Sequence, residues 1–376
     1  MYIEQRVRTG TAWGAASGGR TTNPQLVLVF GPRAALGDRA AWDDLARMYA
    51  GARIIGCSTA GEIAGVHVLD DSLVATAIEL EHGRIAVAAT PVGEAPDGVA
   101  IGAELAARLP RDGLVHVLVI SEGLEINGSA LVAGLVGELA SGVGVTGGLS
   151  GDGARFERTC VCLDGPEPTQ QVVAIGLYGE RLHIGYGSRG GWDPFGPERR
   201  ITRSTGNVLY ELDGEPALDL YKRYLDQHAA GLPATGLLFP LAIRGETGDP
   251  VVRTILAIDE AARSLRFAGN VPTGYRARMM KANLERLVEG AASAARTALA
   301  CTGAAPAELA ILVSCVGRKL VLKQRIEEEV ESVRDVLGER TVLMGFYSYG
   351  EISPFAAAAP CELHNQTMTI TTLSER

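Results

Sequence analysis

Two short glycine-rich segments contain the residues best suited to bind a small ligand. GCSTAGEI (56–63) and GFYSYGEI (345–352) share the pattern G-x-x-x-x-G-E-I. Glycine lets a backbone approach a ligand closely, and successive backbone N–H groups can face that ligand. The glutamates could accept hydrogen bonds from a ligand ammonium group, or they could lock two modules of the protein together. Both interpretations stay open: a site for an amino-acid-like or other small polar ligand, and a structural role.

Other side chains near these loops could complete a ligand site. Tyr347 and Tyr349 offer apolar faces with hydroxyl tips, and Arg318 could pair bidentately with a carboxylate. A weaker third copy of the pattern is GGLSGDGARF (147–156), in which Gly151-Asp152 replaces Gly61-Glu62. The residues that we expect to bind the ligand are Cys57, Ser58, Thr59, Gly61, Glu62, Asp152, Arg155, Cys315, Arg318, Tyr347, Tyr349, Gly350, Glu351, His364 and Asn365.

Other site chemistries have weaker sequence support. GVGVTG (142–147) matches the dinucleotide pattern, but a helix is expected before it and a strand after it, the reverse of a Rossmann unit. Ser58 is not in a G-x-S-x-G elbow, so a hydrolase that uses Ser58 or Cys57 ranks last. Cys361 and His364 would point to opposite faces of a strand and have no second ligand pair nearby. We therefore predict no metal site and no enzymatic activity.

The same order of elements leads into each glycine-rich loop: strand, helix, strand. The first copy begins with an apolar strand, and Asp38 can cap its helix. In the last copy, apolar residues at helical spacing predict a single helix over Lys319–Leu337, with Glu327, Glu328 and Glu329 mostly on its solvated face. The strands expected in these two copies and the middle one are Leu26–Phe30, Arg53–Cys57, Leu114–Ser121, Ile311–Cys315 and Thr341–Gly345.

These elements predict an α/β fold, with α+β as the alternative, in which related strand–helix–strand units form mixed sheets. Strands at 72–80 and 84–91, joined by Glu81-His82-Gly83, are expected to form a long antiparallel segment, which argues against a purely parallel sheet. A long helix is expected over Met279–Leu299. We divide the chain into an N-terminal extension (1–25) and two domains, 26–213 and 214–376, and expect the ligand site where the glycine-rich loops converge, between the domains.

Composition narrows the class of protein. With 47% hydrophobic and 21% charged residues the chain can bury a large core and is not intrinsically disordered. A net charge of −9 and a pI near 5.3 disfavour nucleic acid and anionic membranes as partners. The six cysteines contain no CxxC pair and are expected to be reduced thiols. No secretory signal or membrane-spanning run is visible, which predicts a cytoplasmic protein.

Several longer stretches make the sequence recognisable. They are GCSTAGEI (56–63), GGLSGDGARFERT (147–159), GWDPFGPERRITRSTGNVLYELDGEPALDLYKRYL (191–225), FAGNVPTGYRARMM (267–280), SCVGRKLVLKQRIEEEVE (314–331), GFYSYGEISPF (345–355) and CELHNQTMTIT (361–371). Together they resemble the FIST family (F-box and intracellular signal transduction), with its N-terminal and C-terminal parts.

The resemblance implies an intracellular sensor of small molecules such as amino acids. It also implies a signalling partner: a histidine kinase, a diguanylate cyclase or a chemotaxis receptor. Some stand-alone members of this size are haem-binding nitric oxide sensors, which makes haem the alternative cofactor and a two-component system the alternative setting. No local motif selects an axial ligand, and His364 belongs to the general family motif HNQT.

Overall fold

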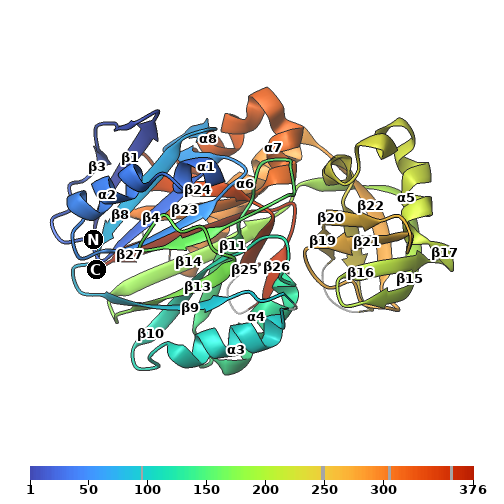
Figure 1. Cartoon of the computed structure of the whole chain (residues 1–376), viewed down its shortest axis with the longest axis horizontal. Helices are drawn as coiled ribbons and strands as arrows, with labels where there is room; N and C mark the ends of the chain where they lie inside the picture. The colour runs from blue at the N-terminus through green and yellow to red at the C-terminus, as the bar shows by residue number, and fades with distance from the viewer. Residues whose placement is uncertain (95, 247–249, 304–305, 356–358) are drawn as a thin grey trace.

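The computed structural model describes residues 1–94, 96–246, 250–303, 306–355 and 359–376. Within these residues the chain forms four β-sheets, which Figure 1 shows in two bodies. Sheets 1 to 3 make the main body. Sheet 4 makes a smaller body, at the right of Figure 1, which the chain builds between residues 192 and 282 before it returns to the main body. The predicted α/β class with mixed sheets is confirmed.

The three sheets of the main body share one order of strands. Sheet 1 runs β12 (Val161–Leu163), β5 (Arg53–Ser58), β4 (Leu26–Gly31), β8 (Leu73–Glu79), β1 (Tyr2–Thr9) and β2 (Ala12–Trp13), with β3 (Ser17–Gly18) beside β1. Sheet 2 runs β26 (Cys361–His364), β25 (Gly350–Pro354), β11 (Gly144–Leu149), β10 (Leu114–Ser121), β13 (Gln171–Tyr178) and β9 (Arg84–Pro91). Sheet 3 runs β7 (His67–Leu69), β6 (Glu62–Ala64), β24 (Val342–Ser348), β23 (Leu309–Cys315), β27 (Met368–Glu375) and β14 (Leu182–Arg189).

Helices connect the parallel strands at the centre of each sheet. The connecting helices are α1 (Arg33–Leu36) and α2 (Arg39–Met48) in sheet 1, α4 (Gly128–Glu138) in sheet 2, and α7 (Val316–Leu322), the 3-10 turn η3 (Lys323–Arg325) and α8 (Ile326–Leu337) in sheet 3. Two further helices, α3 (Gly98–Arg108) and α6 (Leu284–Cys301), pack on α4 and α8. Asp38 accepts a hydrogen bond from Ala40 N at the start of α2, as the sequence predicts.

The strand–helix–strand unit occurs three times. The parallel pairs β4–β5, β10–β11 and β23–β24 each form the centre of one sheet, and an antiparallel strand flanks the first member of each pair: β8, β13 or β27. The third copy of the pattern is therefore confirmed as the unit of sheet 2.

Each unit gives strands to a neighbouring sheet. After the first glycine-rich loop, β6 joins sheet 3 beside β24; after the last, β25 joins sheet 2 beside β11; and β12, which follows the middle loop, joins sheet 1 beside β5. Likewise β9 leaves unit 1 for sheet 2, and β14 leaves unit 2 for sheet 3. In sheet 1 the corresponding place beside β8 belongs to β1. The three units therefore form a closed ring.

The central strands are buried on both faces, which explains their continuous apolar sequences. Along β4, Leu26, Leu28 and Phe30 face a core shared by all three sheets of the main body, whereas Val27 and Val29 pack under α1 and α2. Phe30 meets Phe346 of β24 in the shared core, with 4.7 Å between ring centroids. Each sheet thus lies between a common core and its own helices.

Four local expectations need correction. The single helix predicted over 319–337 is broken, because α7 ends at Leu322 and Lys323 takes a φ of 51° before α8 begins. Glu329 is fully buried rather than solvated. The strands predicted at 72–80 and 84–91 exist, but β8 and β9 lie in different sheets. The helix expected from Met279 begins at Leu284, because β22 (Arg276–Ala282) takes up the preceding residues.

Sheet 4 is antiparallel and builds the smaller body. It runs β19 (Val251–Arg253), β18 (Leu241–Arg244), β22, β15 (Trp192–Thr205), β16 (Val208–Leu212), β21 (Ser264–Phe267) and β20 (Ile255–Asp259), with β17 (Glu215–Pro216) beside β16. The helix α5 (Ala217–Leu225) and the 3-10 turns η1 (Asp226–Gly231) and η2 (Ala234–Leu238) accompany it. The predicted boundary between residues 213 and 214 lies in the turn between β16 and β17, and the predicted extension (1–25) supplies β1, β2 and β3 to sheet 1.

Candidate functional site

The three glycine-rich loops meet inside the main body. Ala60 N donates to the carbonyl of Tyr347, and Tyr347 N donates to the carbonyl of Gly61, each over 2.8 Å. The middle loop joins the first through Gly151 N, which donates to Ser58 O over 2.9 Å, and joins the last along the β11–β25 pairing. The expected convergence of the loops is therefore present, and main-chain hydrogen bonds hold it together.

Glu62 is held by hydroxyl groups from its own unit. Thr59 Oγ1 donates to one carboxylate oxygen over 2.5 Å, and Ser72 Oγ, just before β8, donates to the other over 3.1 Å. The side chain is buried, and this burial raises its pKa to about 7 even though both hydroxyls favour the charged form.

Glu351 has the same arrangement in the last unit. Ser348 Oγ donates to it over 2.6 Å, and Thr367, just before β27, donates through both its N–H and its hydroxyl group. Burial raises the pKa of Glu351 to about 8. In both units the glutamate thus ties its loop to the start of the antiparallel strand that flanks the unit, β8 or β27, which is the structural role that the sequence leaves open.

Asp152 replaces the glutamate in the middle unit and is bonded differently. Its carboxylate accepts the backbone N–H groups of residues 156–158 and the hydroxyl of Tyr349. The ring of Phe156 stacks on Tyr349 with 4.5 Å between centroids. Asp152 therefore fixes the loop that follows it and links it to the last glycine-rich loop.

Arg318 is fully buried, and its donors are used within the main body. Its Nε donates to Glu329 over 2.9 Å, and the terminal nitrogens donate to the carbonyls of Gly190 and Leu287 over 3.1 and 2.7 Å. Glu329 also accepts the hydroxyl of Tyr347 over 2.7 Å. The guanidinium that we expected to meet a ligand carboxylate thus meets the protein's own carboxylate.

Most of the predicted site residues are inaccessible to solvent. Apart from Arg155, which is exposed, all of them are buried. Ser58 Oγ accepts Cys160 N over 2.9 Å. Burial raises the pKa of both the Cys57 and the Cys315 thiol above the ordinary range. These environments do not activate a nucleophile at position 57 or 58.

His364 and Asn365 line a pocket of about 160 Å³ beside Trp192 and Phe355. His364 Nε2 donates to Ser353 O over 2.7 Å, which leaves Nδ1 as a buried nitrogen with no hydrogen-bond partner in the described part of the chain. Burial lowers the pKa of His364 to about 4. A free ring nitrogen suits haem iron, but this pocket is smaller than the roughly 300–1,000 Å³ typical of cofactor sites. The residues at His364 therefore do not fit haem.

A larger pocket of about 530 Å³ lies between the two bodies. The main body contributes α4 and β26, and the smaller body contributes β18, β19 and the segment before β22. Its lining residues are Ser129, Val132, Ala133, Ile243, Gly245, Val251, Arg253, Asn270, Pro272, Tyr275, Phe355, Ala359, Pro360, Cys361, Glu362 and Leu363. This volume is in the range of small-molecule sites, and the lining is mostly apolar with a few polar groups, as such sites usually are.

Sequence reasoning missed this pocket. Arg253, Asn270, Tyr275 and Glu362 belong to no catalytic or ligand motif, and 109 positions of sequence separate Arg253 from Glu362. The signal that could have found them is the family resemblance, because FAGNVPTGYRARMM (267–280) and the CELH segment both line the pocket. Both stretches carry the family resemblance, which by itself assigns no pocket to them.

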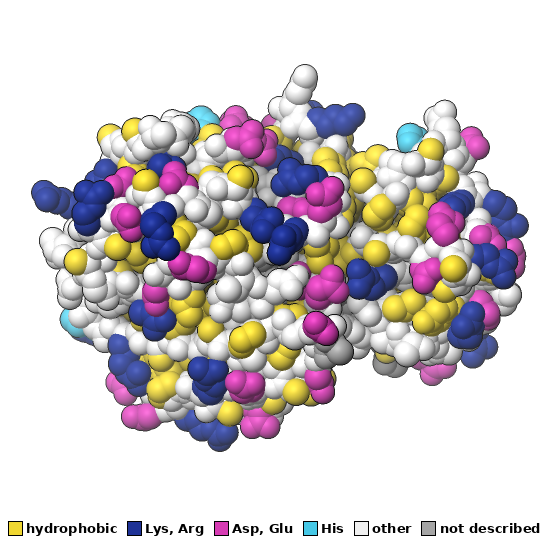
Figure 2. Space-filling model, viewed as in Figure 1, with side chains coloured by type: hydrophobic (Ala, Val, Ile, Leu, Met, Phe, Trp, Pro, Cys, Tyr) yellow, Lys and Arg dark blue, Asp and Glu magenta, His cyan; other side chains and the backbone are white. Residues whose placement is uncertain are grey.

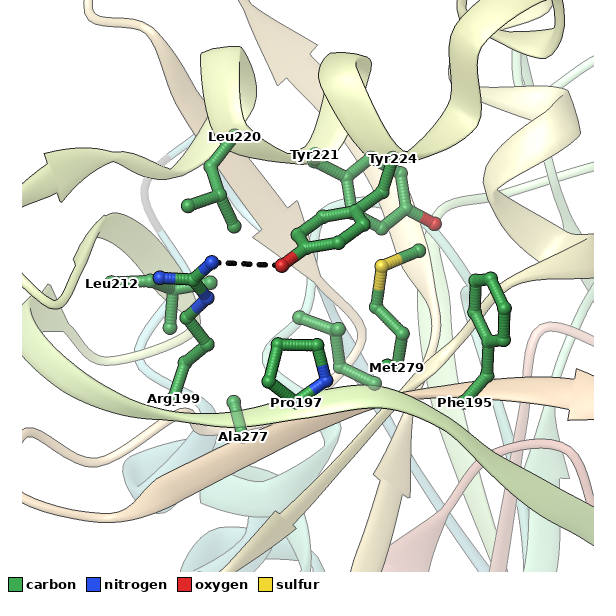
Figure 3. A pocket seen from close by; sticks show the side chains of 11 residues that line it. Phe195, Pro197, Arg199, Leu212, Leu220, Tyr221, Tyr224, Ala277 and Met279 are labelled. Carbon is green, nitrogen blue, oxygen red and sulfur yellow. Dashed lines mark hydrogen bonds between the residues drawn. The ribbon is translucent and has the colours of Figure 1, made fainter.

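Two other hollows are less suited to a metabolite. The slot in Figure 3, between β15, α5 and β22, encloses about 10 Å³, and Arg199 crosses it to donate to Tyr224 Oη over 2.8 Å. An open groove of about 620 Å³ includes Asp152 and Arg155 together with Arg33 and Arg158. Asp152 is already saturated by backbone donors, and both Arg155 and Arg158 are exposed.

Charged side chains of the two signs are not separated on the face that Figure 2 shows. Figure 2 shows basic and acidic groups interspersed over the visible face. In the part of the chain that the structure describes, no three His, Cys, Asp or Glu side chains are placed to hold a metal ion. No helix among the described residues combines the length and the apolar character needed to cross a membrane.

Two known proteins show weak similarity to this chain. An uncharacterized protein of Methanocaldococcus jannaschii, MJ1623, is 24% identical over 222 residues, which are 55% of this chain and 41% of that protein, so this chain matches less than half of its relative's length. The solved structure of a cyanuric acid hydrolase from A. caulinodans aligns with 78% of this chain and 99% of its own, at 10% identity and a TM-score of 0.18, which is too low to support a shared fold or activity.

Family comparison covers most of the sequence. Residues 25–215 match the FIST N domain and residues 217–354 match the FIST C domain. The chain therefore belongs to the FIST family, whose domains are associated with small-ligand sensing in signal transduction.

Proposed function

We propose that this protein is a cytoplasmic sensor that binds a small metabolite in the pocket between its two bodies and passes its state to a signalling partner. The observation that carries the proposal is the pocket itself: about 530 Å³, lined by side chains of both bodies. A ligand that touches both bodies can favour one arrangement of them over another, which is what a sensor requires.

The two bodies are joined in a way that suits such a response. The chain enters the smaller body through Gly190 and Gly191 and leaves it at Asn283, and the two crossings are adjacent because Trp192 pairs with Ala282. Gly191 has a φ of 145°, a conformation that favours glycine. Two neighbouring crossings allow the smaller body to pivot without disturbing the ring of the main body.

Asn365 offers a route from the pocket to the glycine-rich loops. Its Oδ1 accepts Thr254 N of the smaller body over 3.2 Å, and its Nδ2 donates to Tyr349 O over 3.0 Å. Thr254 follows Arg253, which lines the pocket. A ligand that shifts this strand would therefore shift a residue bonded directly to the last glycine-rich loop.

The partner remains a histidine kinase, a diguanylate cyclase or a chemotaxis receptor, as the family resemblance implies. The ligand is an amino-acid-like or other small metabolite. The geometry at His364 gives no support to haem, and the buried positions of Ser58 and Cys57 give none to a hydrolase.

A thermal-shift screen of the full chain against a metabolite library tests the proposal. A ligand of the pocket raises the melting temperature as its occupancy rises. Tyr275 lines the pocket and is 40% exposed, so Tyr275→Ala removes ligand contacts and should reduce the rise in melting temperature. Phe195→Ala is the matched control, because Phe195 is a 38% exposed aromatic of the same body outside this pocket. Equal shifts in wild type and Tyr275→Ala would place the ligand elsewhere.

A further inference from the structure

One side chain of the inter-body pocket is a buried cation that directly contacts no carboxylate of the described residues. Arg253 is only 6% exposed, yet no carboxylate of the described residues lies within 4.0 Å of its guanidinium. The other two buried guanidinium groups each contact a carboxylate: Arg8 has Asp38 at 2.7 Å, and Arg318 has Glu329 at 2.8 Å. Burial lowers the pKa of Arg253 to about 10, and the charge of Glu362 offsets only part of this effect. Buried charges in proteins are normally paired, so Arg253 is an exception that needs an explanation.

The donors of Arg253 are only partly used. Nε donates to Asn270 O over 3.0 Å. Nη1 donates to Leu363 O over 2.8 Å, which joins the smaller body to the main body, and to Val252 O over 3.4 Å. The nearest acceptor for Nη2 is Ser129 Oγ at 3.5 Å, and this hydroxyl already accepts Asn270 N. A guanidinium has five N–H groups. Arg253 therefore keeps donor capacity, chiefly on Nη2, at the wall of a pocket large enough for a metabolite.

The other residues that line the pocket indicate which further chemical groups a ligand would carry. Val132, Ile243, Val251 and Phe355 give apolar surface, and Tyr275 adds an aromatic face. Glu362 is half-buried in the same lining, so its carboxylate can meet a cationic group.

We infer that the pocket is a carboxylate site, in which Arg253 holds the ligand's carboxylate and the apolar wall holds an apolar side group. This inference rests on the proposed function, because it takes the inter-body pocket as the sensory site. The bound carboxylate would supply the missing counter-charge. Arg253 donates hydrogen bonds to both bodies, so a carboxylate bound to Arg253 would also stabilise the contact between them.

Matched probes test the charge requirement directly. The full chain is titrated by calorimetry with alanine, leucine and phenylalanine, with their amides, and with the corresponding acids that lack the amino group. Each set keeps one side group and changes one charge. We expect the acids and amino acids to bind and the amides to bind at least about tenfold more weakly, since a hydrogen bond to a charged group contributes about 1.5–3 kcal/mol.

Two arginine variants separate charge recognition from docking. Arg253→Gln should weaken carboxylate binding about 10- to 100-fold and leave amide binding nearly unchanged. Arg266→Gln is the matched control, because Arg266 also faces the main body, 3.7 Å from Glu125, but does not line the pocket. If Arg253→Gln fails to fold, Arg253→Lys provides the comparison: it keeps the charge, loses the bidentate geometry, and should bind acids with intermediate affinity.

The outcomes distinguish the inference from the function on which it rests. Amides that bind as tightly as acids, or no binding by any acid of the panel, would overturn the carboxylate site. A neutral metabolite whose binding is weakened by Tyr275→Ala would overturn it too, while it supports the proposed function. Acids whose affinity responds to neither Tyr275→Ala nor Arg253→Gln would overturn both.

Discussion

Arg318 and Glu329 form an ion pair from which solvent is fully excluded, with 2.8 Å between Nη2 and Oε2. Eleven residues along one straight helix would separate them by about 16 Å. They meet because the chain turns back at Lys323, between α7 and α8. The break in the helix is therefore what builds the pair.

Removing one partner of this ion pair should strongly destabilise the fold. Glu329→Gln leaves a buried guanidinium without its counter-charge, and we expect it to lower the free energy of unfolding by about 3–5 kcal/mol. Urea unfolding followed by circular dichroism measures the change. Glu285→Gln, which breaks the exposed pair with Arg325, is the control and should not move the midpoint. A Glu329→Gln midpoint equal to that of the control would refute the stabilising role of the pair.

Gly345 has no room for a side chain. A Cβ at this position would overlap the carbonyl oxygen of Leu312 on the neighbouring parallel strand. Gly345→Ala must therefore push β24 away from β23, and we expect it to lower the free energy of unfolding by about 3 kcal/mol, the upper end of the usual cost of overpacking a core. Gly137→Ala, in α4 with open space around it, should instead stabilise by about 0.5–1 kcal/mol. Thermal melts of both variants test this contrast; similar melting temperatures would contradict it.

The two buried glutamates predict an unusual dependence of stability on pH. Folding raises the pKa of Glu62 to about 7 and that of Glu351 to about 8, against 4.5 for an unperturbed glutamate. The folded chain thus binds more protons than the unfolded chain between these values, and its stability falls as pH rises through 7 and 8. Buried His116 and His364, with pKa values of about 3 and 4, act in the opposite sense only below about pH 6.5.

Urea midpoints between pH 6.5 and 8 measure this effect. We expect a loss of about 1–2 kcal/mol over that window. Glu351→Gln, which keeps an acceptor oxygen but cannot ionise, should flatten the slope. Glu180→Gln, at an exposed position before β14, should leave it as in the wild type. A wild-type stability that rises with pH over this window would show that the carboxyls are ionised in the fold.

Asn365 should control how firmly the smaller body is docked. Asn365→Ala leaves Thr254 N and Tyr349 O without their partner, and each buried unsatisfied group costs about 1–3 kcal/mol. We expect lower stability and faster tryptic cleavage at Arg189, next to the crossing into the smaller body. Asn23→Ala, an exposed substitution in the main body, is the control. Unchanged cleavage in Asn365→Ala would mean that other contacts fix the docking.

The regular part of the fold could be read from the sequence because its patterns are local. Buried parallel strands give continuous apolar runs, and the recurring glycine-rich loop marks the end of each unit. The reversal at Lys323 gave no such signal, since Leu322 and Ile326 keep the helical spacing on both sides of it. Glu329 consequently looked solvated. The exchange of strands between sheets depends on contacts between distant segments, which periodicity does not encode.

The site was harder to predict for the same reason. Glycines and acids gathered in short motifs drew attention to the loops, where the structure uses Glu62 and Glu351 as internal ties. Arg253 stands in a short strand with no motif around it. Its environment exists only because the smaller body folds back against β26, so its missing counter-charge is a property of the tertiary structure alone.

The closed ring of units has a topological consequence. The Met1 ammonium group lies 3.8 Å from a carboxylate oxygen of Glu375, so the two termini of Figure 1 are neighbours. A short linker could join them, and the chain could then be opened between Asp112 and Gly113, in the exposed turn before β10, with every sheet intact. Such a circular permutant should unfold in urea like the parent. The fold requires the three units in one cyclic order, but any of them can come first along the chain.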